Sequence, residues 1–171
     1  LAVAGAAAGN LTRAHLELGG KAPAVVFAGV DVAATAEGVV GAAFFNAGQD
    51  CTAVTRVIVA REIHDALVEA LVAAAEALTV GDVEDAYYGP LNNATHFAKV
   101  VGALADLPEH ASIATGGGRI GDTGFFLEPT VVTGVRQDDA IVQQETFGPV
   151  LTVQPFDSEA EAVELANGVD Y

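Results

Sequence analysis

The sequence predicts an α/β fold in which a mostly parallel sheet is flanked by helices. Short apolar runs rich in β-branched residues alternate along the chain with longer stretches of helical periodicity. Hydrophobic residues make up 51% of the 171 positions, enough for one domain with a substantial core. No apolar run approaches the ~20 residues that a membrane-spanning helix needs. We therefore expect one layered domain.

The first half of the chain predicts two strands and three helical segments. The strands are apolar, and one of them is bounded by Pro23 and Gly29; they cover residues 24–27 and 55–60. The predicted helical segments cover residues 2–8, 32–46 and 62–78. We expect the first of them to be the last part of a longer helix. Asp31 is a suitable N-cap for the second segment. Gly48 lies just past the end of that segment, where a C-terminal glycine is expected.

The second half continues the alternation. A helix over residues 93–107 ends before Pro108. Apolar, β-branched runs predict strands over residues 112–115, 131–135 and 150–156. Ser158 then caps a last helix, with Glu161 at the capping-box position.

The charge and cysteine content restrict the partners and the compartment. The formal net charge is −16, from 23 acidic and 7 basic residues, so nucleic acid and anionic membranes are poor partners. A single cysteine cannot form an internal disulfide, and no secretory signal opens the chain. We therefore expect a cytoplasmic protein.

Cys51 and Glu17 could together make and hydrolyse a thioester. Cys51 lies in Phe-Phe-Asn-Ala-Gly-Gln-Asp-Cys-Thr, and Glu17 lies in Leu-Glu-Leu-Gly-Gly-Lys-Ala-Pro. A thiolate can attack an aldehyde carbon, and a partly buried carboxylate can activate the water that releases the acyl group. The apolar neighbours of Glu17 favour such burial. The alternatives are an inert buried thiol and a surface glutamate.

These two stretches, followed by Gln-Glu-Thr-Phe-Gly-Pro-Val at residues 144–150, resemble the aldehyde dehydrogenase superfamily over essentially the whole chain. The resemblance is closest to the aminoaldehyde group, which acts on γ-aminobutyraldehyde or betaine aldehyde. It implies an aldehyde dehydrogenase catalytic-domain-like fold, Cys51 as nucleophile, Glu17 as base, and NAD or NADP as cofactor. It also implies that Glu145 accepts hydrogen bonds from the nicotinamide ribose, while Phe147 packs near the nicotinamide ring.

Four further residues follow from the resemblance. Gly19 belongs to the cofactor-binding set, and the Gly19–Gly20 pair would allow a tight chain reversal close to the reacting centre. His96 occupies a position near the same ribose. Phe45 would line the aldehyde entry. Asp50 could attract a cationic amine on the substrate, or could point away or form a salt bridge elsewhere.

Two other patterns carry no expected site. Residues 116–121, Gly-Gly-Gly-Arg-Ile-Gly, match a dinucleotide-binding pattern, but turn and strand sequence follows where that motif needs a helix. We therefore expect a surface loop. His15, His64 and His110 are scattered without metal-ligand spacing, so no metal site is expected.

The resemblance also implies that residues 1–171 are a partial domain, mainly the catalytic part, with the dinucleotide-binding part absent. The full-length form would then be a homo-oligomer, either a dimer or a tetramer. Two alternatives stay open. One is a succinate-semialdehyde or general aldehyde dehydrogenase; the other is a truncated, non-catalytic fragment that acts only by association.

Overall fold

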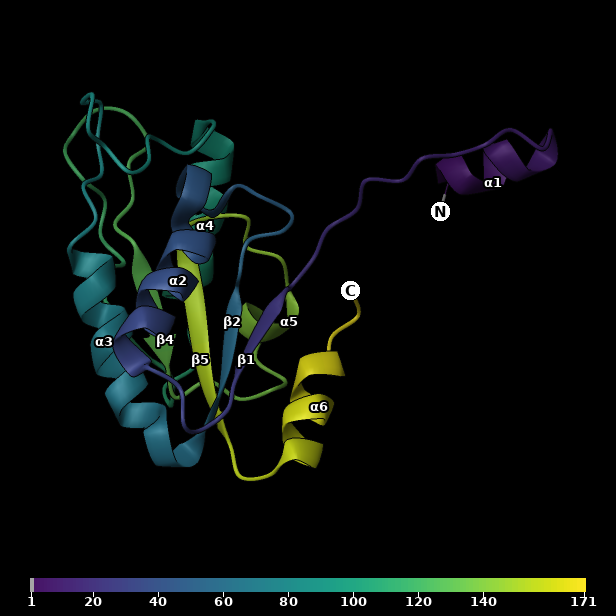
Figure 1. Ribbon diagram of the computed structural model, residues 1–171. Helices are drawn as coiled ribbons and strands as arrows, with labels where there is room; N and C mark the ends of the chain where they lie inside the picture. Colours follow the sequence, from purple (N-terminus) through teal and green to yellow (C-terminus); the bar gives the residue numbers. More distant parts are fainter. Residues whose placement is uncertain (1) are drawn as a thin grey trace.

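A five-stranded sheet forms the centre of the computed structural model, which describes residues 2–171 (Figure 1). The strand order is β1-β2-β5-β4-β3. Neighbouring strands among the first four are parallel, and β3 is antiparallel to β4. The strands are β1 (Pro23–Val26), β2 (Arg56–Ala60), β3 (Ser112–Thr115), β4 (Thr130–Thr133) and β5 (Val150–Phe156). The predicted fold and all five predicted strands are confirmed.

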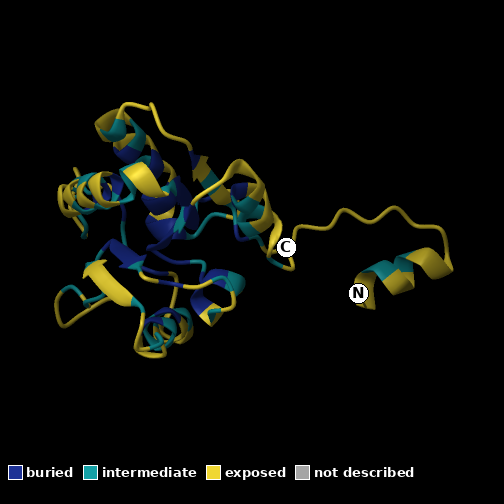
Figure 2. Ribbon diagram, turned by 90° about the horizontal axis from the view of Figure 1, so that it is seen from below, coloured by how far each residue is buried: buried dark blue, intermediate teal, exposed yellow. Residues whose placement is uncertain are grey.

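Helices cover both faces of the sheet, because the central strands are apolar on both sides. In β2, Val57 and Val59 join the large core beneath the helices α2 (Val32–Phe44) and α3 (His64–Glu76). Ile58, which points the other way, packs with Phe156 and Ala162 under α6 (Glu159–Asn167). Figure 2 shows the buried residues gathered between these layers. Two further helices of the body are α4 (Ala94–Ala105), which the sequence predicted, and α5 (Ala140–Gln143), a four-residue helix that it did not predict.

The helix ends follow the expected capping chemistry, with one difference. Asp31, Asn93 and Ser158 each accept a hydrogen bond from the backbone N–H three residues later. Glu161 accepts from the backbone N–H of Asp157 rather than from that of Ser158. Short 3₁₀ segments occupy Phe45–Gly48 and Arg61–Ile63.

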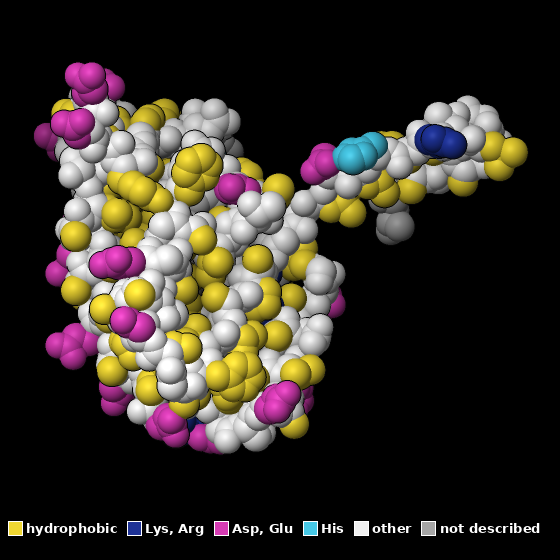
Figure 3. Space-filling model, in the orientation of Figure 1, with side chains coloured by type: hydrophobic (Ala, Val, Ile, Leu, Met, Phe, Trp, Pro, Cys, Tyr) yellow, Lys and Arg dark blue, Asp and Glu magenta, His cyan; other side chains and the backbone are white. Residues whose placement is uncertain are grey.

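Residues 2–19 form an arm outside the body of the domain. Helix α1 (Ala2–Gly9) has no buried residue, and residues 10–19 are all exposed. Figure 1 shows this arm leaving the body at the start of β1. On the face of the body shown in Figure 3, acidic side chains lie mainly along the left edge and the base. No helix among residues 2–171 is both long and apolar enough to cross a membrane.

Arg56, at the start of β2, is fully buried and ties three segments together. Its Nε donates to the carbonyl of Lys21 at 2.9 Å. Its terminal nitrogens donate to the carbonyls of Leu165 and Ala166 at 2.8 and 2.9 Å. A cation is favourable at this carboxyl end of α6, where helix carbonyls lack intrahelical donors. Arg56 thereby fixes the base of the arm and the end of α6 to the sheet.

Candidate active site

The three segments that carry the predicted chemistry lead into the amino ends of neighbouring parallel strands. Residues 17–21 precede β1, Cys51 precedes β2, and residues 145–147 precede β5. The register aligns Pro23 with Arg56, and Arg56 with Thr152. Because amino ends of parallel strands meet at one edge of a sheet, the three segments meet there.

The loop that carries Cys51 has an unusual backbone. Asn46, Ala47 and Gly48 have φ angles of 52°, 59° and 66°, in the left-handed region. This run ends the preceding helix two residues earlier than predicted. Gly48 is therefore more than a helix-ending glycine, since a Cβ there would lie 2.2 Å from the carbonyl oxygen of Gly148. The Cys51 loop and the Glu145–Phe147 turn thus touch backbone to backbone.

Gln49 fastens this loop to a third segment. Its Nε2 donates to the carbonyl of Asn46 at 3.1 Å, and its Oε1 accepts from the backbone N–H of Asn92 at 2.8 Å. The Cys51 thiol that follows is exposed and free. The geometry therefore presents an accessible thiol on a loop held at several points.

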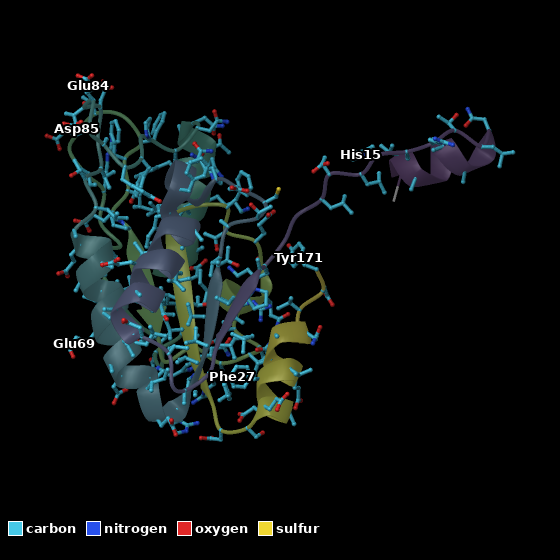
Figure 4. The ribbon with its side chains drawn as sticks, in the orientation of Figure 1. His15, Phe27, Glu69, Glu84, Asp85 and Tyr171 are labelled. Atoms are coloured by element: carbon cyan, nitrogen blue, oxygen red, sulfur yellow. The ribbon has the colours of Figure 1, made fainter. Side chains whose placement is uncertain are left out.

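The Glu145 carboxylate lies over the Gly19–Gly20 backbone. Its Oε1 accepts from the Gly20 N–H at 3.1 Å. A Cβ on Gly19 would come within 2.6 Å of its Oε2, so a side chain there would displace the carboxylate. The Tyr171 hydroxyl accepts from the Glu145 N–H at 3.4 Å, and Figure 4 shows this tyrosine near the base of the arm. The structure therefore brings Glu145 and Gly19 together.

Phe147 is held from the side by His96. Its φ of 56° is uncommon for a bulky residue. His96 Nε2 donates to the Phe147 carbonyl at 2.6 Å, and the two rings meet edge to face at 6.1 Å. His96 thus contacts the turn on which Glu145 lies.

Both lysines of the chain also contact this turn, which sequence reasoning missed. Lys21 is 2% exposed, and its Nζ donates to Thr146 Oγ1 at 3.4 Å. Burial, reinforced by the neighbouring Arg56 charge, lowers the pKa of Lys21 to about 8, although Glu145 opposes this shift. Lys99 Nζ donates to the Glu145 carbonyl at 3.0 Å. The sequence offered one signal: lysine is rare in this very acidic chain, which has only two of them.

Glu17 lies in a different environment from the one predicted. Its side chain is 78% exposed and contacts the His15 ring, and Leu16 and Leu18 are exposed beside it. Figure 4 shows His15 on the arm, away from the body. The prediction of partial burial is wrong because residues 11–18, Glu17 among them, are all exposed.

The segment around Gly19–Gly20 also differs from expectation, because it runs without the predicted chain reversal. The two glycines instead permit close approach. A Cβ on Gly20 would lie 3.2 Å from the Cys51 carbonyl oxygen. The arm therefore starts beside the thiol loop, and Glu17 lies three residues further along it.

Asp50 and Phe45 lie on the same loop as Cys51. Asp50 Oδ1 accepts from both the N–H and the hydroxyl of Thr52, each at 2.8 Å. The backbone hydrogen bond first, and then the hydroxyl, lower the pKa of Asp50, which keeps it charged. The Phe45 ring is 60% exposed.

The glycine-rich pattern at residues 116–121 is a loop, as predicted. Gly116, Gly117 and Gly121 have positive φ, and no helix begins there. Within residues 2–171 no group of three or more His, Cys, Asp or Glu side chains could hold a metal ion. His64 and His110 instead pair with Asp65 and Asp139.

Comparisons with known proteins agree over nearly the whole chain. Residues 2–171 match the model of the aldehyde dehydrogenase family. Betaine aldehyde dehydrogenase of Bacillus subtilis is 42% identical over 173 residues, which cover 97% of this chain and 35% of that protein. The chain thus spans about a third of the length of such relatives.

Solved structures give the same result. Betaine aldehyde dehydrogenase from Staphylococcus aureus, in complex with NAD⁺, superposes with a TM-score of 0.90 at 36% identity. That match covers 99% of this chain and 35% of the other. A 3,6-anhydro-L-galactose dehydrogenase in complex with NADP gives a TM-score of 0.93 at 36% identity, covering 98% and 37%.

The backbone contact at Gly48 generates a stability prediction. We expect Gly48→Ala to lower the free energy of unfolding by at least about 2 kcal/mol, because it adds both left-handed strain and a clash with Gly148. The matched control is Gly38→Ala. Gly38 lies in the interior of α2 with nothing within 4 Å of a new Cβ, so alanine should stabilise by about 0.5–1 kcal/mol. Urea unfolding of both variants measures this, and equal effects would contradict the contact.

The buried ammonium of Lys21 generates a pH prediction. Its folded pKa of about 8 lies below its ordinary value of 10.5, so between these pH values the unfolded chain binds more protons. The free energy of unfolding of the wild type, minus that of Lys21→Met, should therefore rise from pH 8 to 10.5, by up to about 3 kcal/mol. Below pH 8 the difference should be flat. Chemical unfolding at a series of pH values measures it, and a flat difference throughout would rule out the lowered pKa.

Proposed function

The chain belongs to the aldehyde dehydrogenase family, and on that premise we propose that it contributes the nucleophile to NAD(P)-dependent oxidation of an aldehyde to a carboxylate. The observation that carries the proposal is the backbone contact between Gly48 and Gly148. This contact sets the Cys51 loop against the Glu145–Phe147 turn. The loop whose Cys51 thiol would bind the aldehyde covalently thus lies next to the turn whose Glu145 would hold the nicotinamide ribose.

The residues of this turn fit a dinucleotide. Glu145 Oε1 is occupied by the Gly20 N–H, but Oε2 has no donor among the described residues and could accept from ribose hydroxyls. Because position 19 is a glycine, no side chain there displaces the carboxylate. The half-buried Phe147 ring offers a flat apolar surface. When bound, the nicotinamide supplies the hydride acceptor; the relatives noted above support either NAD or NADP.

Cys51 would begin the reaction as a thiolate that attacks the aldehyde carbon and forms a C–S bond. Loss of hydride from that carbon leaves a thioester. Glu17 would then take a proton from water, which attacks the acyl carbon and returns the thiol and a carboxylate. This role requires the arm to bring Glu17 back towards Cys51. Three extended residues span about 10 Å, so a change in direction at Gly19–Gly20 is sufficient.

The substrate we favour is an aminoaldehyde. Two of the relatives described above are named betaine aldehyde dehydrogenase, and betaine aldehyde is cationic. The charged Asp50 directly precedes the nucleophile. We place the reaction in the cytoplasm, because a catalytic thiol needs a reducing compartment. We also propose that the full-length enzyme is a homo-oligomer, either a dimer or a tetramer.

The test of the mechanism separates acylation from deacylation in the full-length protein. We expect Cys51→Ala to lower aldehyde-dependent NADH formation by at least about 1,000-fold, because no covalent adduct can form. Glu17→Gln should still give one burst of NADH, followed by slow turnover and an acyl adduct on Cys51 detectable by mass spectrometry. The matched control is Glu69→Gln, an exposed glutamate on α3 (Figure 4), which should keep full turnover. Retained turnover in Cys51→Ala would reject the mechanism.

The role of Asp50 has its own test. Asp50→Ala should raise the KM for γ-aminobutyraldehyde about fivefold through lost attraction, while the KM for propanal stays within about twofold. Asp50→Asn serves as the control for loop geometry, because its side-chain oxygen can still accept from Thr52. It should match Asp50→Ala for the aminoaldehyde. An equal change in the KM values for γ-aminobutyraldehyde and propanal would show that the Asp50 charge does not select a cationic substrate.

A further inference from the structure

One side chain supplies the long-range hydrogen bonds of the Cys51 loop. Among residues 2–171, every hydrogen bond between residues 46–52 and a segment distant in sequence involves the Gln49 side chain. Its Oε1 accepts from the Asn92 N–H at 2.8 Å, and its Nε2 donates to the Pro90 carbonyl at 3.4 Å. The bond from Asn92 is the stronger of the two, because 3.4 Å exceeds the usual N–H···O distance.

The other contacts of the loop fix its shape rather than its orientation. The Gln49 N–H and Nε2 both donate to the Asn46 carbonyl at 3.1 Å, and Asn46 Nδ2 donates back to the Gln49 carbonyl at 3.0 Å. The close approach of Gly48 to Gly148 sets how near the loop comes to the Glu145–Phe147 turn. A hydrogen bond is directional, whereas such a steric contact is not. The orientation of the loop therefore depends on the bond between Gln49 and the distant segment.

The segment that Gln49 contacts leads directly into α4, which also contacts Phe147. The Asn93 side chain caps α4, because it accepts from the His96 N–H at 2.9 Å. His96 Nε2 in turn donates to the Phe147 carbonyl at 2.6 Å. The short stretch of residues 90–96 therefore contacts two parts of the candidate site, which are the loop with the thiol and the turn proposed to hold the nicotinamide.

We propose that Gln49 is a positioning residue that fixes the Cys51 thiol relative to Phe147, so that hydride leaves the Cys51 adduct towards the nicotinamide. This inference rests on the proposed function. The Gln49 amide is occupied by backbone groups, so it acts through the loop and not on reacting atoms. An amide suits this task because it accepts from an N–H and donates to carbonyls at one position. Alignment matters because reacting atoms must approach to about 3–3.5 Å.

The kinetic test compares hydride transfer with a thiol reaction that needs no cofactor, in the full-length protein. Gln49→Met should slow NADH formation about 30-fold, because the thiol loses its alignment. The KM for the dinucleotide and the hydrolysis of p-nitrophenyl acetate by Cys51 should each change less than about threefold. The matched control is Gln137→Met. Gln137 is also half-buried and donates to two backbone carbonyls, but it lies outside the site, so this variant should keep full NADH formation. Equal losses of NADH formation and ester hydrolysis in Gln49→Met would overturn the proposal.

Two charged variants separate the acceptor of Gln49 from its donor. Gln49→Glu keeps an oxygen that can accept from the Asn92 N–H, whereas Gln49→Lys can donate to carbonyls but offers no acceptor. Gln49→Glu should therefore form NADH within about threefold of the wild-type rate, and Gln49→Lys should be about 30-fold slower than the wild type. Equal rates in these two variants, or the reverse order, would overturn the proposal. Because both variants are polar, the pair also decides the matter if Gln49→Met does not fold.

Hydrogen exchange separates this inference from the proposed function. In the full-length protein, mass spectrometry can follow the exchange of the Asn92 amide without any catalysis. This amide should exchange about fivefold faster in Gln49→Met and Gln49→Lys than in the wild type, because one hydrogen bond is lost, and Gln49→Glu should match the wild type. Equal exchange in all variants would overturn the inference even if the enzyme is active. If the wild type forms no NADH but Asn92 exchange responds in this way, the proposed function fails and Gln49 still holds the loop.

Discussion

The parallel pairing of β1, β2 and β5 is the constraint on which the candidate site depends. Each of these strands is preceded by a segment that carries a candidate site residue. The register places the three segments side by side. An antiparallel arrangement of the same strands would send one of the segments to the far edge of the sheet. Arg56 reinforces this arrangement, because it belongs to β2 but hydrogen-bonds to Lys21 at the entry of β1.

Glycine makes close approach possible at this edge. Gly48 meets the Gly148 carbonyl, Gly19 meets the Glu145 carboxylate, and Gly20 meets the Cys51 carbonyl. A side chain at Gly48 or Gly19 would occupy space that the partner already fills, whereas a Cβ at Gly20 would make a tight contact at 3.2 Å. Only Gly48 also has a positive φ, so the other two glycines are required by proximity rather than by conformation. The site is therefore assembled mainly from backbone contacts, and the functional side chains project from them.

Much of this fold could be predicted from local sequence because its elements agree with their composition. The strand over residues 150–156 and the helix capped by Asp31 follow from β-branched runs and N-cap chemistry. The four-residue α5 could not be predicted, since one helical turn has no periodicity to detect. The early end of α2 was missed because Asn46 and Ala47 adopt left-handed angles that tertiary contacts impose.

The candidate site was predictable by residue type but not by environment. Cys51, Glu145 and Phe147 were proposed as site residues from their motifs, whereas the Lys21–Thr146 contact joins residues 125 positions apart and has no local signature. The burial of Glu17 was predicted wrongly because apolar neighbours bury a residue only when another segment covers them.

Both lysines of a strongly acidic chain lie beside the Glu145–Phe147 turn. A net charge of −16 opposes an anion at long range, but salt screens exposed charges beyond about 8 Å at physiological ionic strength. Within that distance, the charges next to the Glu145 turn decide the potential. There Lys21 and Lys99 donate to Thr146 Oγ1 and to the Glu145 carbonyl, so this turn has positive charge beside it in a chain that is strongly acidic as a whole. A protein can thus stay strongly acidic overall and still keep positive charge at one turn, provided that its few cations lie there.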